Sequence, residues 1–134
     1  MRRTGVRDGA AVEIVRIYLR LVEERHLEEA RRHLAPEAEI TFPGGRRFDD
    51  LDAQVAAAAG RYRAIRKVFE GFDVIGAAES IVVYAFGELE GEDLAGRPFA
   101  GVRFIDRFEL VDGRITSHRV WNDLAEAMRE RSSE

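Results

Sequence analysis

The chain has 134 residues, a mass of 15.2 kDa and 46% hydrophobic residues, so we expect a single domain over residues 1–134 whose core spans 8–131. The net charge is −4, with 21 basic and 25 acidic residues spread along the chain, which argues against a nucleic-acid-binding surface. The absence of cysteine excludes disulfides and thiolate metal sites, and the lack of a long apolar run or secretory leader predicts a cytoplasmic protein without a membrane partner.

The first half of the chain predicts three helices and one strand. Apolar residues at helical spacing predict a helix of about four turns that Asp8 caps, followed by a short helix over 26–34. Residues 39–42 are typical of a short strand. Asp49 or Asp50 is expected to cap a third helix, whose apolar stripe reaches Ile65 and whose basic residues up to Lys67 we expect to be solvated.

After residue 67 the apolar period changes to 2, which predicts strands over 68–75 and 80–90 and a final hairpin. Asp112 and Gly113 can occupy the positive-φ positions of its turn. A last helix is expected to start at Asn122 or Asp123. Helices followed by an antiparallel meander favour an α+β fold, in which a curved antiparallel sheet wraps around helices as a cone-shaped roll.

The hairpin also carries the candidate chemistry. If Phe104 and Phe108 face inwards, so does Asp106, and the turn length decides whether His118 or Arg119 faces it. A buried histidine beside a carboxylate has a defined tautomer and can act as a general acid or base. Tyr18, on the first helix, can donate its hydroxyl to a developing oxyanion. The alternative is a structural pair in which Asp106 and His118 only satisfy each other.

The same assignment of faces predicts the rest of a pocket and an outer surface. The expected pocket-lining residues are Ile40, Phe42, Tyr84, Phe86, Glu88, Val102, Phe104, Val120 and Asn122. Glu88 is alternatively a solvated rim residue, and Asn122 alternatively only a helix cap. The outer face would carry Ile81, Val83, Ala85 and Ile105 among charged residues, with Trp121 in sheet packing or a dimer contact; it predicts a homodimer through the sheet. Three histidines without ligand spacing predict no metal, and no other cofactor is expected.

The segments IYLRLVEERHLEEARRHLAPEAEITFP and FIDRFELVDGRITSHRVWNDL, with the third helix, resemble the SnoaL-like domains of the nuclear transport factor 2-like superfamily over residues 10–130. The resemblance implies a cystatin-like α+β cone, which hosts isomerases, cyclases, hydrolases and binders. The helix tyrosine of the similar ketosteroid isomerases falls on Tyr18, but their two acidic residues fall on Phe42 and Phe104. The aspartate of limonene-epoxide hydrolases and SnoaL-type cyclases falls on Val120, so those mechanisms are in doubt.

These observations predict a protein that binds a small hydrophobic molecule, polycyclic ones included. If it is an enzyme, we expect a cofactor-free isomerase, cyclase or lyase in which His118 is the base, Asp106 orients it and Tyr18 stabilises the oxyanion. A non-catalytic ligand carrier is the first alternative, favoured by the three missing carboxylates. A dimerisation module with a filled cone is the second.

Overall fold

The computed structural model describes residues 6–76 and 78–132. Within this part of the chain one curved sheet of six strands has the order β2-β1-β6-β5-β4-β3. β1 (Leu34–Thr41) pairs in parallel with β6 (Arg114–Asn122), and every other neighbouring pair is antiparallel. The remaining strands are β2 (Arg47–Phe48), β3 (Ala64–Gly76), β4 (Ile81–Glu92) and β5 (Pro98–Val111).

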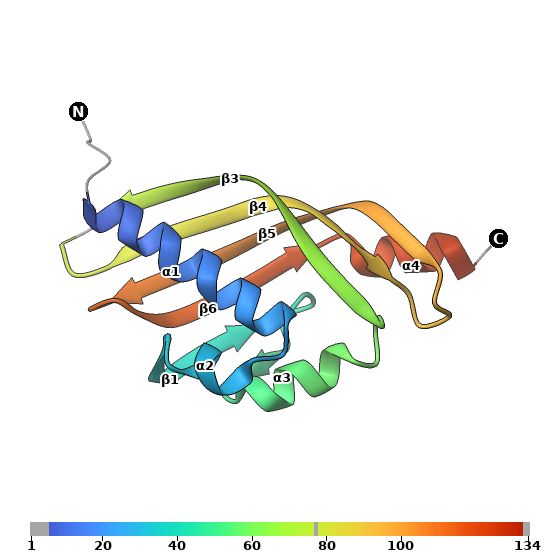
Figure 1. The fold of residues 1–134 in the computed structure, drawn as a ribbon, viewed down its shortest axis with the longest axis horizontal. Coiled ribbons are helices and arrows are strands. Elements are labelled where there is room, and N and C mark those ends of the chain that lie inside the picture. The colour runs from blue at the N-terminus through green and yellow to red at the C-terminus, as the bar shows by residue number, and fades with distance from the viewer. Residues whose placement is uncertain (1–5, 77, 133–134) are drawn as a thin grey trace.

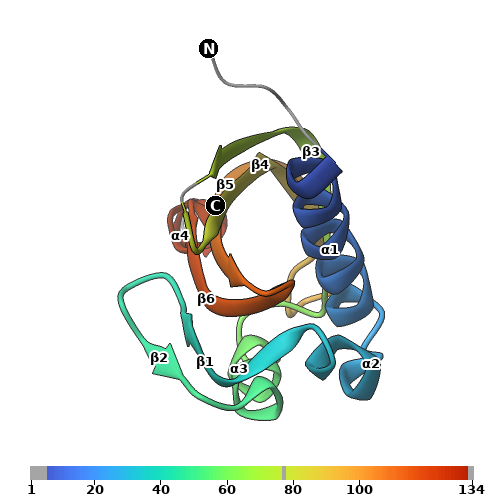
Figure 2. The same cartoon turned by 90° about the vertical axis from the view of Figure 1, so that its left-hand side faces the viewer.

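Four helices accompany the sheet in the described residues. α1 (Val6–Glu23) lies along the inner face, while α2 (Leu27–Arg31) and α3 (Leu51–Ala58) lie beside β1 (Figure 1). α4 (Leu124–Ser132) follows β6 at the end of the sheet away from the start of α1. Figure 2 shows β3 to β6 curling into a roll with α1 along its open side, which confirms the predicted α+β architecture.

The core fills the space between α1 and the curved sheet. Its largest cluster joins Val15, Tyr18 and Leu19 of α1 to inner residues of the strands, among them Val83 and Phe108. A second cluster lies under α4 and consists of Leu89, Phe99, Val102, Phe104 and Leu124. Val102, Phe104 and Phe108 share one face of β5 because alternate residues of a strand point to the same side, and the register shift between Leu89 and Gly91 brings Phe99 to that face as well.

Several predicted boundaries are wrong. α1 begins at Val6, so Asp8 lies in its first turn instead of capping it. β1 begins at Leu34, five residues earlier than predicted, and its register with β6 shifts between Leu34 and Glu39, where Pro36 lies. The third helix ends at Ala58, because the chain from Ala64 onwards pairs with β4 and tertiary pairing overrides the helical period.

The hairpin between β5 and β6 has a two-residue turn, one of the two lengths that the sequence left open, with φ 51° at Asp112 and 76° at Gly113. Asp106 lies opposite Val120 on β6, so the expectation that His118 or Arg119 pairs with it across the strands is wrong. The register of the hairpin shifts by one residue at Thr116, whose hydroxyl donates to the carbonyl of Glu109 at 3.1 Å. A regular ladder from this turn would place His118 on the face opposite Asp106. The bulge therefore brings the two side chains to the same inner face.

β3 approaches β4 closely at Gly87. A Cβ at this position would lie 2.1 Å from the carbonyl oxygen of Val68 and 2.8 Å from the amide nitrogen of Glu70. We therefore expect Gly87→Ala to lower the free energy of unfolding by about 1–3 kcal/mol, because backbone atoms of β3 would have to move. Urea titration measures this loss.

Gly9→Ala is the matched control, because a Cβ at Gly9 in α1 meets nothing within 4 Å. Alanine is the better helix former, so this change should raise the stability by about 0.5–1 kcal/mol. A Gly87→Ala protein as stable as the parent would mean that β3 and β4 do not approach so closely.

Candidate functional site

The centre of the candidate site is the carboxylate of Asp106 on β5, whose side chain is 0% exposed. Its Oδ2 lies 2.5 Å from Nζ of Lys67 on β3 and 3.2 Å from Nε2 of His118 on β6. β3 and β5 are separated by β4, whose inner residues at this level are the small Ala85 and Gly87. Their size leaves room for the long Lys67 side chain to cross β4 and reach Asp106.

The three groups set one another's charge. Burial disfavours the Asp106 carboxylate, but Lys67 and His118 outweigh burial and hold the pKa of Asp106 below its usual value. Burial lowers the pKa of His118; Asp106 opposes this effect, and the charge of Lys67 adds to it. At neutral pH the group therefore contains an ammonium, a carboxylate and a neutral imidazole.

The imidazole of His118 has a defined tautomer and orientation. An ionised carboxylate only accepts hydrogen bonds, so Nε2 carries the proton and donates to Asp106, which leaves the lone pair on Nδ1. Within the described residues Nδ1 has no hydrogen-bond partner. The ring stacks on Phe108 with 4.1 Å between centroids, and Tyr18 packs edge-on at 5.9 Å. His118 is therefore held as a neutral base.

A cavity of about 70 Å³ lies beside this group, between the second half of α1, α3 and the sheet. Tyr18, Lys67 and His118 line it together with apolar side chains, which are Leu19, Val22, Phe42, Pro43, Ile65, Leu89, Val120 and Leu124. Glu23, Arg25, Gln54, Arg61, Tyr62 and Asn122 complete the wall. An apolar hollow with a few convergent polar groups is the usual form of a small-molecule site.

Several of the predicted site residues meet at this cavity. Tyr18, Phe42, His118, Val120 and Asn122 line it, and the Asn122 side chain also accepts a hydrogen bond from the amide of Leu124 at the start of α4. Asp106 is fully buried and reaches the cavity only through Lys67 and His118. The core, and not the cavity wall, holds Ile40, Val102 and Phe104.

The predicted faces of β4 are wrong. Tyr84, Phe86 and Glu88 lie on the outer face, where Arg107 Nε donates to the Tyr84 hydroxyl at 3.3 Å. The inner face carries Ile81, Val83 and Ala85 instead, each at most 7% exposed. Both sets of alternate residues are apolar, so hydrophobicity could not separate them. The inner-facing residues of β4 include small side chains because α1 and the Lys67 side chain pass over this face of the strand.

The outer face has a hollow of its own, of about 660 Å³, which Phe86 and Glu88 line together with Ile105 and Trp121. Ile105 is 46% and Trp121 50% exposed. Exposed apolar side chains on a sheet favour an interface. The homodimer through this face stays a prediction.

Lys67 is the site residue that sequence reasoning missed. Its placement among solvated basic residues of the third helix is wrong, because α3 ends at Ala58 and β3 carries Lys67 on its inner side. The sequence pattern of residues 65–70 already indicates this position. Ile65, Lys67 and Phe69 are alternate residues, so in a strand they point to the same face. A lysine among inward apolar residues predicts a buried partner.

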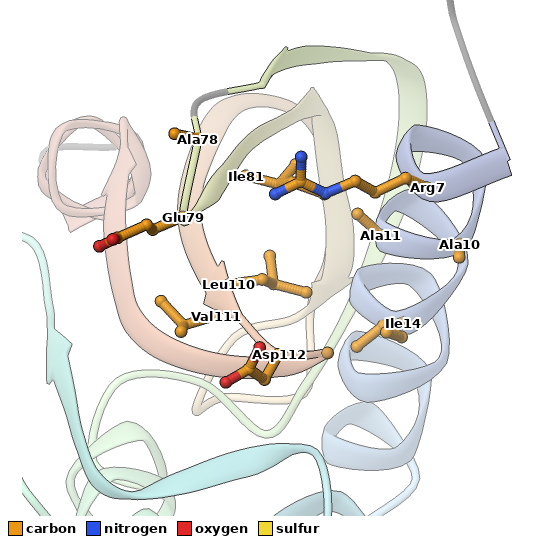
Figure 3. Close-up of a pocket in the computed structure, with 11 residues that line it drawn as sticks. Arg7, Ala10, Ala11, Ile14, Ala78, Glu79, Ile81, Leu110, Val111 and Asp112 are labelled. Carbon is orange, nitrogen blue, oxygen red and sulfur yellow. The ribbon is translucent and has the colours of Figure 1, made fainter.

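A third hollow, of about 530 Å³, lies at the end of α1 away from the Tyr18 cavity, beside the turn between β5 and β6 (Figure 3). Aliphatic side chains such as Ile81 and Leu110 form its floor, and the charged residues around it, Arg7, Glu79 and Asp112, are exposed. It contains no buried titratable group among the described residues, so the cavity at Tyr18 is the better candidate for chemistry.

The described residues show neither a metal site nor a membrane-spanning helix. Over residues 6–76 and 78–132, no three histidine, aspartate or glutamate side chains gather in a way that would hold a metal ion. No helix in the same part of the chain is long and apolar enough to cross a membrane.

Comparisons with known proteins concern the fold. No family model and no curated protein matches the sequence. A solved NTF2-like protein of unknown function from Burkholderia pseudomallei K96243 is 22% identical with a TM-score of 0.72, and the match covers 90% of this chain and 95% of that one. The structure of TerC co-crystallised with polyporic acid has 18% identity, a TM-score of 0.72 and coverages of 90% and 96%.

A protein from Jannaschia sp. CCS1, provisionally assigned as a SnoaL-like polyketide cyclase, is 20% identical with a TM-score of 0.67; the match covers 96% of this chain and 95% of that one. At such identities the likeness concerns the path of the chain and leaves activity open. The chain therefore has the NTF2-like fold.

Proposed function

We propose that the cavity binds a small organic molecule and that His118 removes a proton from a carbon next to its carbonyl group. The observation that carries this proposal is the fully buried Asp106, which holds His118 in one tautomer beside an apolar cavity. A general base must be unprotonated at the working pH and fixed in orientation, and the lowered pKa of His118 and its stacking on Phe108 meet these two conditions.

Tyr18 and Lys67 have supporting roles in this proposal. Burial, and then the charge of Asp106, raises the pKa of Tyr18, so its hydroxyl stays protonated and can donate to the oxygen that becomes negative. Lys67 keeps Asp106 ionised. Returning the proton from His118 to another carbon of the same molecule would complete an isomerisation, with no net consumption of protons.

The cavity volume sets the size of the molecule. About 70 Å³ is well below the roughly 300–1,000 Å³ of sites for drug-sized ligands, so we propose a ligand with one ring or a short chain. A polycyclic ligand would require the walls to move. The SnoaL-like assignment of one similar structure, and the co-crystallisation of TerC with polyporic acid, support a ligand-binding role for this fold.

Non-catalytic binding is the second candidate function. It is favoured by the mutual pairing of Lys67, Asp106 and His118 through Oδ2 of Asp106, which a purely structural group would also make. The three groups would then stabilise the floor of a ligand site and move no proton.

Exchange of α-protons for deuterium separates the two functions. Cyclohexanone in D₂O, followed by proton NMR, should exchange faster with the protein than with buffer alone. Phenol, which has the planar shape and hydroxyl of an enol, should bind and inhibit the exchange. Phenol binding without any protein-dependent exchange would reject proton transfer and leave non-catalytic binding.

A further inference from the structure

The mouth of the cavity carries two arginines whose charge has no carboxylate partner. Arg25 follows α1 and Arg61 precedes β3, and both line the cavity. Across residues 6–76 and 78–132, neither guanidinium has a carboxylate oxygen within 4 Å. Glu23 lines the same cavity, but its Oε2 lies 3.3 Å from Nη1 of Arg20 and its Oε1 accepts the Lys67 amide at 2.7 Å.

The backbone of Arg25 is in a conformation that favours glycine. Its φ is 62°, and its amide and that of His26 donate to the carbonyls of Val22 and Leu21 at 3.1 and 2.8 Å. This is the Schellman ending of a helix, whose left-handed position is usually glycine. An arginine there costs stability, and its side chain reaches the mouth of the cavity, where Nη1 also donates to the carbonyl of Val22 at 2.7 Å. Strain at a ligand-facing residue is typical of a functional position.

Several other side chains of the cavity wall can donate hydrogen bonds. Gln54 on α3 is only 8% exposed, and its side-chain amide has no hydrogen-bond partner in the described part of the chain. The hydroxyls of Tyr18 and Tyr62 likewise have none there. A ligand that offers oxygen acceptors can take hydrogen bonds from the Gln54 amide and from the two hydroxyls.

Together these groups specify the charge of the ligand. Lys67 is paired with Asp106 and Glu23 with Arg20, so Arg25 and Arg61 leave an excess of positive charge at this end of the cone. A carboxylate would be attracted to this charge. Glu23 at the same mouth would repel the second charge of a phosphate dianion.

We infer that the ligand of this cavity is a small organic carboxylate, with its carboxylate at Arg25 and Arg61 and its apolar part directed inwards, towards His118. Two planar guanidinium groups suit the two oxygens of a carboxylate. The inference rests on the proposed function only in placing the ligand in this cavity; it holds whether or not His118 moves a proton.

Benzoate and benzamide test the inference, because they have nearly the same shape and differ in charge. Protein-observed NMR titration should show benzoate binding at least about 10-fold more tightly than benzamide at low salt. Arg61→Gln should weaken benzoate about 5–10-fold and leave benzamide unchanged. Arg66→Gln is the matched control, because Arg66 pairs with Glu90 at 3.4 Å outside the cavity; it should change neither affinity.

Arg25→Gly separates binding from stability. It should weaken benzoate about 3–5-fold because one cation is lost from the mouth. It should also raise Tm by about 3 °C, because glycine removes the backbone strain. Weaker binding by a more stable protein cannot be due to unfolding.

Equal affinities for benzoate and benzamide, or benzoate affinities that neither arginine substitution changes, would overturn the inference. So would the absence of benzoate binding at about 10 mM, a concentration well above the Kd of even a weak specific ligand. The benzoate result and the proton-exchange result can fail separately. A wild-type protein that exchanges cyclohexanone protons without preferring benzoate would retain the function and lose the inference. A protein that prefers benzoate but exchanges no cyclohexanone protons would retain the inference and lose the proposed proton transfer.

Discussion

Replacing His118 with glutamine should lower the protein-dependent exchange of cyclohexanone α-protons by about 10²–10⁴-fold, the contribution of a positioned general base. Glutamine can still donate a hydrogen bond to Asp106 and fill most of the space against Phe108, but it has no basic nitrogen. The rate constants come from the decay of the α-proton signals in D₂O, measured at equal protein concentration.

The pH dependence of exchange gives a second test of the same base. Burial lowers the pKa of His118, so its neutral form is present at pH 7 and above. The exchange rate should be level there and fall on acidification, with its midpoint below the ordinary histidine value of about 6.5. The His118→Gln replacement should remove this midpoint. A His118→Gln protein that exchanges protons at the wild-type rate, with equal Tm, would assign the base to another residue.

The sequence predicted the elements that depend on period and turn chemistry. Alternation placed Phe104, Asp106 and Phe108 on one inner face, and Asp112-Gly113 marked a turn that the structure confirms. These features are local: a period of 2 needs only neighbouring residues, and positive φ is decided within the turn. The recognised resemblance then predicted the fold.

The parts that failed, or that the sequence left open, depend on contacts between distant segments. Whether His118 shares a face with Asp106 depends on one extra residue at Thr116, and no local pattern marks that bulge. The two faces of β4 are both apolar, so its orientation depends on what crosses it. Lys67 reaches Asp106 only because the sheet curls and Gly87 lets β3 approach β4. Such proximity is a property of the folded sheet.

Replacing Lys67 with methionine should lower the free energy of unfolding at pH 7 by about 3–5 kcal/mol, the cost of leaving one member of a buried ion pair without its partner. Asp106 is fully buried, and Lys67 is the charged group nearest its Oδ2. Methionine keeps the length and the apolar stem, so packing changes little. Urea titration with tryptophan fluorescence from Trp121 measures the loss.

The loss should shrink as the pH falls. In the wild type the pKa of Asp106 is lowered, so the stability that its ionised form contributes is present above the unfolded value of about 3.9 and is lost only below it. Without Lys67, burial is the leading influence and raises the pKa of Asp106, while His118 loses the nearby charge that lowers its own pKa. On acidification one of these two groups then binds a proton, which removes the unpaired buried charge. The difference in unfolding free energy between the Lys67→Met protein and the wild type should therefore become smaller between pH 7 and pH 5.

The double replacement Lys67→Met with Asp106→Leu provides the control. It removes both charges from the interior, so it should recover most of the lost stability, as apolar replacements of buried ion pairs often do. Arg66→Met on the same strand changes an exposed pair and should cost less than about 1 kcal/mol. A Lys67→Met protein as stable as wild type at pH 7 would mean that water already solvates Asp106. The buried carboxylate could then no longer fix the tautomer of His118, and the proposed base would lose its physical foundation.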